Sequence, residues 1–174
     1  TVQSTSAKAS RNFRFADSEI LVALAGNPNV GKSTVFNELT GMNQHTGNWP
    51  GKTVALAKGT ARHQETDYTL VDLPGTYSLI ANSAEEAIAS EFICFQKPAV
   101  TIVVCDATAL QRNLNLVLQI LQMTANVVVC VNLMDEARKK KIEIDLEKLS
   151  ELLQVPVVAA SARSHQGLDA LMDA

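Results

Sequence analysis

A short apolar run that ends in a glycine-rich loop limits this chain to a small set of folds. Residues 20–25 (ILVALA) are continuously apolar, as in a strand buried on both faces of a sheet. Residues 26–33 (GNPNVGKS) follow at once and fit the pattern GxxxxGK[ST]; helical periodicity then runs over Lys32–Thr40 and stops at Gly41. This order predicts a phosphate-binding loop between a strand and a helix.

The rest of the chain alternates between apolar runs and helical periodicity. Further strands are predicted at 53–60, 66–73, 99–105, 126–131 and 155–159, and further helices at 83–95, 113–123, 145–153 and 167–172. Residues 44–52 show no periodicity and are expected to form a loop. The strands at 53–60 and 66–73 are close enough to pair as an antiparallel hairpin. The sequence therefore predicts an α/β fold with a six-stranded, mostly parallel sheet and helices on both faces.

The glycine-rich segment, called the phosphate loop below (residues 26–33), carries the chemistry of a phosphate cradle. Gly26 and Gly31 let backbone N–H groups turn inward, and the start of the next helix adds positive potential. Lys32 is expected to reach the β- and γ-phosphates, and the Ser33 hydroxyl to ligate Mg²⁺. The residues expected to contact nucleotide here are Gly26, Asn27, Asn29, Val30, Gly31, Lys32, Ser33 and Thr34.

A second motif, Asp72-Leu73-Pro74-Gly75, stands at the end of the predicted strand 66–73. An aspartate in this position can hold Mg²⁺ through a water molecule, and the Gly75 N–H can meet a γ-phosphate. Aspartate and glycine are common in turns, so this motif alone is weak evidence for a nucleotide site. Its position after the phosphate loop is what favours that interpretation.

Two later motifs favour guanine over adenine. Asp135, in Asn132-Leu133-Met134-Asp135, can accept from guanine N1–H and the 2-amine together, whereas adenine offers a lone pair and no amine. An unpaired buried acceptor costs about 1–3 kcal/mol or more, so adenine is disfavoured. Asn132 is expected to tie the base loop to the phosphate loop. Ser161-Ala162 is expected to present the Ala162 N–H to guanine O6, with Arg163 where many GTPases have lysine.

Composition excludes several other classes. The 174 residues are 47% hydrophobic, enough for one core, and the net charge of −3 argues against a nucleic-acid partner. No apolar stretch approaches the roughly 20 residues of a transmembrane helix. Cys94, Cys105 and Cys130 have no CxxC spacing, which indicates reduced core thiols. Residues 1–18 are polar and basic and are expected to be a flexible segment ahead of a nucleotide-binding domain at 19–174.

With these motifs in order, the chain resembles the translation-factor-related GTPases, which have a Ras-like fold. More narrowly, it resembles the G domain of FeoB, the family of bacterial ferrous-iron transporters. The segments that carry the resemblance are GNPNVGKSTVFNELTG from Gly26, GNWPGKTV from Gly47, VDLPGTYSL from Val71, QRNLNLVLQ from Gln111 and VNLMDEARKKKIEIDLEKLSELLQVPVV from Val131. Residues 20–174 are covered, and GNWPGKTV is the most specific segment.

The resemblance implies two switch loops, the first over 47–51 and the second over 72–79. Thr53 would ligate Mg²⁺ when a γ-phosphate is present, and Gly51 would contact the nucleotide. Asn29 matches the asparagine of potassium-activated members; K⁺ there would place positive charge between the phosphates, with carbonyls near Asn48 and Trp49 completing its shell. The residues expected to support hydrolysis are Lys32, Asn29, Thr53 and Gly75.

The roles of a few further residues are left open or are inferred from the residue type that is missing there. Trp49 is left between a role beside K⁺ and simple packing at the surface. Thr76 stands where many signalling GTPases have a water-orienting glutamine, so slow hydrolysis is expected. His45, His63 and His165 lie in polar loops and are expected at the surface.

The resemblance implies a domain that binds GTP and GDP, hydrolyses GTP slowly and regulates a ferrous-iron transporter at the cytoplasmic face of the cell membrane. Its partners would be helical and membrane domains of the same polypeptide, absent from this fragment, which is itself expected to be soluble. A homo-oligomer formed through the membrane part stays open, and no nucleic acid is expected. The alternatives are an RNA- or ribosome-associated GTPase and a nucleotidase with relaxed base specificity.

Overall fold

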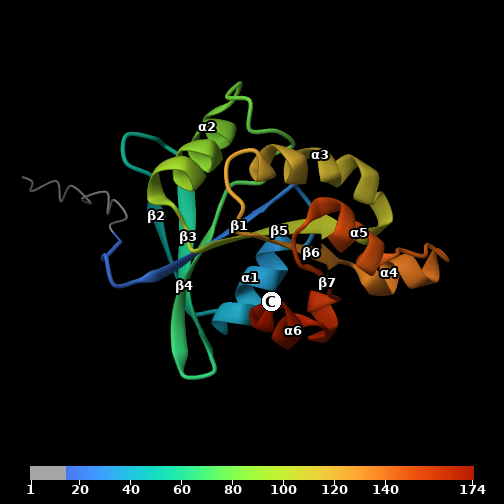
Figure 1. The fold of residues 1–174 in the computed structure, drawn as a ribbon. Coiled ribbons are helices and arrows are strands. Elements are labelled where there is room, and N and C mark those ends of the chain that lie inside the picture. Colours follow the sequence, from blue (N-terminus) through green and yellow to red (C-terminus); the bar gives the residue numbers. More distant parts are fainter. Residues whose placement is uncertain (1–14) are drawn as a thin grey trace, which may run out of the picture.

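A computed structural model describes residues 15–174 (Figure 1), and the structural statements below concern this part of the chain. The strands are β1 (Ile20–Gly26), β2 (Gln44–Asn48), β3 (Ala55–His63), β4 (Thr66–Asp72), β5 (Val100–Asp106), β6 (Val127–Asn132) and β7 (Val157–Ala159). The helices are α1 (Lys32–Thr40), α2 (Ala84–Glu91), α3 (Leu110–Leu121), α4 (Met134–Lys139), α5 (Leu146–Leu153) and α6 (Leu168–Asp173). A π-helical turn, Phe92–Gln96, continues α2.

The described strands form one sheet in the order β2-β3-β4-β1-β5-β6-β7. The five strands from β4 to β7 are parallel, while β3 pairs antiparallel with both β2 and β4. The predicted α/β class and hairpin are therefore confirmed. The parallel strands end at Gly26, Asp72, Asp106, Asn132 and Ala159 along one edge, so the predicted motifs meet there.

The predicted number of strands is wrong: the described chain has seven strands, because part of the expected loop 44–52 forms β2. β2 pairs with β3 from Gln44↔Gly59 to Asn48↔Ala55. Its residues are polar or glycine and mostly exposed, as befits an edge strand that buries neither face. Such a strand has no apolar alternation, and for this reason the sequence pattern missed it.

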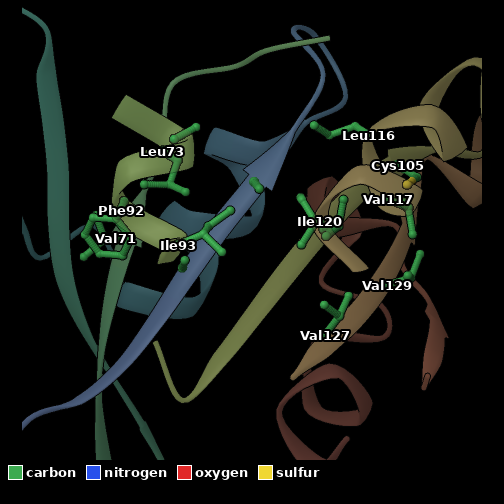
Figure 2. Close-up of a cluster of buried hydrophobic side chains, with 14 of the residues drawn as sticks. Val71, Leu73, Phe92, Ile93, Cys105, Leu116, Val117, Ile120, Val127 and Val129 are labelled. Atoms are coloured by element: carbon green, nitrogen blue, oxygen red, sulfur yellow. The ribbon is translucent and has the colours of Figure 1, made fainter. Parts of the chain in front are cut away.

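Helices cover both faces of the sheet, as predicted (Figure 1). Val35 and Phe36 of α1 and Leu171 of α6 pack on one face. On the other face, α2 and the π-helical turn bring Ile88 and Phe92, while α3 brings Leu116 and Ile120. Figure 2 shows Phe92 of the π-helical turn beside Val71, and Val117 and Ile120 of α3 on the side of Val127 and Val129. The two buried layers fix the strand ends in place.

Element boundaries follow local capping chemistry. α1 spans the predicted residues, and the Gly41 N–H at its end donates to Asn37 O in a left-handed conformation. α2 begins after Ser83, whose Oγ accepts from the Glu86 N–H at 3.1 Å, as the capping pattern predicts. Asp145 caps α5 in the same way. The short helix α4 was not predicted, because its sequence MDEARK is mostly charged, with Met134 and Ala137 as its apolar residues.

The segment expected to be flexible lies mostly outside the described residues, of which Phe15 is the first. The Phe15 ring meets Phe92 edge-on at 5.7 Å, and Lys58 Nζ lies 4.9 Å above the Phe15 ring. Residues 15–18 of that segment therefore adjoin a packed part of the domain.

The three cysteines are free thiols, and two of them belong to the core as predicted. Burial raises the pKa of the Cys105 and Cys130 thiols to about 12, so both remain protonated and unreactive at neutral pH. Cys94, by contrast, is exposed on the π-helical turn.

Replacing Ser83 by alanine should lower the free energy of unfolding by about 1 kcal/mol, because the Glu86 N–H loses its capping acceptor. Ser90→Ala is the matched control within the same helix, and it should change stability by less than about 0.5 kcal/mol. Urea unfolding followed by circular dichroism measures both. Equal effects of the two substitutions would contradict the capping role.

Candidate nucleotide-binding site

A cavity of about 410 Å³ lies at the start of α1, where the sequence predicted the phosphate cradle. Its lining residues are Asn27, Pro28, Asn29, Gly31, Lys32, Ser33, Thr34 and Gly75. Six of the expected phosphate-loop contacts are thus brought together, and Gly75 joins them from the loop after β4. Gly26 and Val30, the other two, are buried beneath the cavity and support the loop.

The shape of the phosphate loop depends on residues that accept unusual backbone angles or very close neighbours. Asn29 and Gly31 are both left-handed, with φ of 64° and 81°. A side chain at Gly26 would come 2.7 Å from Val104 O, and one at Gly75 would come 3.2 Å from Pro28 Cα. A side chain is therefore excluded at Gly26 and would be tightly packed at Gly75.

Lys32, Ser33 and Asp72 form a polar cluster beside the cavity. Lys32 Nζ donates to Asp72 Oδ1 and, at 2.6 Å, to Leu73 O. The Ser33 hydroxyl lies 3.4 Å from Asp72 Oδ2. A hydroxyl and a single carboxylate this close suit Mg²⁺, which is bound by one or two protein oxygens together with substrate phosphates. Two of the three residues predicted to ligate Mg²⁺, Ser33 and Asp72, are therefore neighbours, although 39 positions separate them in the sequence.

Asn132 is the centre of the loops at this edge of the sheet. Its side chain is 1% exposed; Nδ2 donates to Val30 O at 3.1 Å, and Oδ1 accepts from the Ala162 N–H at 3.0 Å. The predicted tie to the phosphate loop is present, and the same amide also holds the Ser161-Ala162 loop. A side chain at Gly31 would clash with Asn132 Nδ2.

The base-binding residues lie on both sides of Asn132. Leu133 turns left-handed, with φ of 64°, and starts α4 so that Asp135 stands in its first turn. The Asp135 N–H donates to Ser161 Oγ at 3.1 Å, which joins the two base motifs directly. Asp135 is half-buried, Ser161 and Ala162 are buried, and Arg163 is exposed.

The first switch loop lies apart from the phosphate cavity. Neither Gly51 nor Thr53 is among the lining residues, and both are exposed. Trp49 is 8% exposed and packs in the core against Phe92, so the surface-packing alternative for this residue is wrong. The carbonyl of Trp49, considered for the K⁺ shell, accepts instead from the Lys52 N–H at 3.0 Å.

The second switch loop is held to the rest of the domain by contacts that the sequence did not reveal. The Thr76 N–H donates to Gly26 O at 3.1 Å, and Thr76 is buried. Gln119 of α3 accepts from the Leu79 N–H at 2.7 Å and from the Ser78 hydroxyl at 3.2 Å. Gln119 is the last residue of the segment QRNLNLVLQ, for which no role was predicted, and the packing of α3 beside the loop identifies its contacts.

The isolated histidines are remote from the cavity lining. His45 and His165 are exposed as expected, and His165 Nδ1 lies 2.6 Å from Glu38 Oε2. His63 is half-buried, which the polar loop around it did not predict, and its Nε2 lies 2.7 Å from Asp173 Oδ1.

Comparison with known proteins identifies this arrangement. The family model for ferrous iron transport protein B matches residues 20–174. The chain belongs to the FeoB family. The Fe(2+) transporter FeoB of Salmonella typhimurium is 41% identical over 157 residues, which are 88% of this chain and 20% of that protein. The FeoB of Methanocaldococcus jannaschii is 53% identical over 104 residues, 60% of this chain and 16% of that protein. The chain thus spans about a fifth of the length of the curated relatives it matches.

Solved structures place the chain more narrowly, in the G domain of FeoB. The G domain from Methanococcus jannaschii is 44% identical, with a TM-score of 0.79, and the alignment covers 89% of this chain and 94% of that one. The cytosolic domain from T. maritima in a GDP form is 39% identical, with a TM-score of 0.86, covering 89% and 61%. The family resemblance and the Ras-like fold are confirmed. Among residues 15–174, no helix is long and apolar enough to cross a membrane.

Substituting Gly31 by alanine should destabilise the domain by about 3 kcal/mol or more, because a left-handed φ and a clash with Asn132 combine. Gly51→Ala is the control: its φ of 74° is also left-handed, but nothing lies within 4 Å of an added side chain. It should cost only about 1–2 kcal/mol. Urea unfolding of both variants separates the clash from the backbone strain, and equal losses would contradict the close packing of Asn132 on the phosphate loop.

Proposed function

We propose that this domain binds GTP and GDP at the edge formed by β1, β4 and β6, hydrolyses GTP slowly, and regulates a ferrous-iron transporter. The observation that carries the proposal is the Asn132 side chain, which joins the phosphate loop to the base loop through Val30 O and the Ala162 N–H. A linkage of this kind sets the distance between a phosphate site and a base site. Membership of the FeoB family supports the same nucleotide.

Guanine specificity would come from Asp135 and Ala162. The Asp135 carboxylate would accept from guanine N1–H and the 2-amine, and the Ala162 N–H would meet O6 once the base displaces or shares the Asn132 contact. The hydrogen bond from the Asp135 N–H to Ser161 Oγ supports this geometry. It holds the Asp135 carboxylate, the acceptor, close to the Ala162 N–H, the donor.

The phosphates would lie in the cavity between the phosphate loop and Gly75. Lys32 would exchange its contacts with Asp72 and Leu73 O for β- and γ-phosphate oxygens. Ser33 and Asp72 would then hold Mg²⁺, with Thr53 as a further ligand and Gly51 nearby. Bound Mg²⁺ would neutralise phosphate charge, and K⁺ beside Asn29 would add positive charge between the phosphates. Asn29 lines the cavity and is exposed, which supports an ion contact.

Slow hydrolysis is supported by the residues around the cavity. The lining side chains include no carboxylate and no imidazole, and Thr76, in place of a water-orienting glutamine, is buried. The attacking water would therefore be oriented by backbone groups of the switch loops and by bound cations rather than by a general base.

The regulatory role is supported by the relatives, which are named Fe(2+) transporters and are roughly four times as long. We infer that the domain works at the cytoplasmic face of the cell membrane, within a polypeptide that includes helical and membrane domains. GTP and GDP would hold the switch loops differently and pass the difference to those domains. The described residues show no cluster of three or more His, Cys, Asp or Glu side chains for a metal, so iron would be carried elsewhere in the transporter.

Asp135→Ala should weaken GTP binding about 100-fold, because two hydrogen bonds to a charged acceptor are lost, while ATP binding stays weak. Glu136→Ala is the matched control: it removes a neighbouring carboxylate that pairs with Lys139. Calorimetric titration of both nucleotides in the presence of Mg²⁺ measures the affinities. Equal GTP and ATP affinities in the unsubstituted domain would overturn guanine specificity and favour a general nucleotidase.

GTP hydrolysis should be roughly tenfold or more faster in potassium chloride than in sodium chloride of the same ionic strength, because K⁺ stabilises transition-state charge. Asn29→Ala should abolish the difference, whereas Asn115→Ala, on the exposed surface of α3, should preserve it. Phosphate release under single-turnover conditions measures the rates. Equal rates in the two salts would remove the potassium role and leave nucleotide binding untouched.

A further inference from the structure

Trp49 of the first switch loop contacts α2, the helix that follows the second switch loop. Trp49, directly after β2, is 8% exposed, and its Nε1 donates to Glu91 Oε2 at 3.2 Å. Its ring lies 5.6 Å from the Phe92 ring at an interplanar angle of 55°. Glu91 ends α2 and Phe92 begins the π-helical turn. We call these three residues, Trp49, Glu91 and Phe92, the Trp49 anchor.

The Trp49 anchor also determines where Thr53 lies. The Trp49 N–H donates to Val54 O at 3.1 Å and the Lys52 N–H donates to Trp49 O at 3.0 Å, so residues 49–54 form a closed turn. The pairing of Asn48 with Ala55 holds both ends of that turn together. Thr53 therefore shifts together with Trp49 unless these hydrogen bonds break. While Trp49 is buried on Phe92, Thr53 is exposed and lies outside the cavity lining.

We propose that Glu91 and Phe92 are positioning residues, which act through Trp49 to hold Thr53 away from the phosphate cavity until GTP draws it in. The proposal rests on the proposed function, because it takes Thr53 as the residue that γ-phosphate and Mg²⁺ recruit. A ligand shifts an equilibrium only by its differential affinity for the two arrangements. GTP would thus release the Trp49 anchor at a cost in its own affinity, whereas GDP, which lacks the recruiting phosphate, would leave the anchor closed.

Glu91 is the residue of the Trp49 anchor that can be substituted without disturbing the core. Phe92 is fully buried and also packs against Phe15, so its removal would disturb the core as well. Glu91 is half-buried at a helix end and accepts the indole N–H at the rim of that core. Losing this acceptor would favour release of Trp49 by roughly fivefold, the effect of one hydrogen bond of ordinary strength.

The chain has one tryptophan, so its fluorescence reports the Trp49 anchor directly. The experiment measures emission and acrylamide quenching of the domain alone, with GDP and with a non-hydrolysable GTP analogue, all with Mg²⁺. We expect protected, blue-shifted emission with GDP, and red-shifted emission with stronger quenching with the GTP analogue. Nucleotide affinities are measured separately by calorimetry.

Three variants test the role of Glu91. Glu91→Ala should raise the affinity for the GTP analogue about fivefold, because this nucleotide binds the arrangement in which Trp49 is released. GDP affinity should stay unchanged, because GDP leaves Trp49 in its buried position. Glu91→Gln keeps an acceptor for the indole N–H and should stay close to the unsubstituted domain. Glu85→Gln removes an exposed carboxylate from the first turn of the same helix and should have no effect on either nucleotide.

The outcomes separate the two proposals. Nucleotide binding with the same tryptophan emission and quenching in GDP and in the GTP analogue would overturn the Trp49 anchor and leave the proposed function standing. Equal changes in GDP and GTP-analogue affinity on Glu91→Ala would likewise overturn it, since they would show a purely structural contact. Failure of the unsubstituted domain to bind either nucleotide would overturn the proposed function itself.

Discussion

The side-chain amide of Asn132 is the interaction on which the site depends. It stands at the end of a fully buried strand and uses its donor and its acceptor on two different loops. Because a buried amide that loses one partner leaves an unsatisfied polar group, the phosphate loop and the base loop are stable only in a shared arrangement. The close approach of Gly31 to the same amide adds a steric constraint.

A second constraint comes from the parallel sheet. β1, β4 and β6 end at the same edge, so Lys32, Asp72 and Asn132 meet there although they lie far apart in the sequence. The Lys32 ammonium and the Asp72 carboxylate neutralise each other in a partly buried place. The Lys32 ammonium would bind the phosphates of a triphosphate, and the Asp72 carboxylate would bind Mg²⁺. Both charged groups are therefore already in position before a ligand arrives. Beyond this cluster, further contacts hold the switch loops, from Gln119 of α3 to the second loop and from Glu91 of α2 to the first.

Local patterns predicted most of the elements. The apolar runs that became β1, β5 and β6 and the caps of α1, α2 and α5 could be read directly, because burial on both faces and capping are each encoded by a few adjacent residues. β2 and α4 could not be predicted, since the edge strand QHTGN and the mostly charged helix MDEARK show no apolar period. Histidine burial was also misjudged at His63, where a partner 110 residues away, Asp173, decides the environment.

The sequence by itself determined the fold class and the phosphate loop, because each depends on short segments with strong local chemistry. It could not predict the burial of Trp49, because the residues on both sides of this tryptophan are typical of a polar loop. Only the tertiary structure decided that this ring packs on Phe92, that Glu91 accepts a hydrogen bond from its N–H, and that Thr53 stands outside the lining of the phosphate cavity. The physical reason is that the position of a loop is set by contacts between segments about forty residues apart, and no local pattern encodes them.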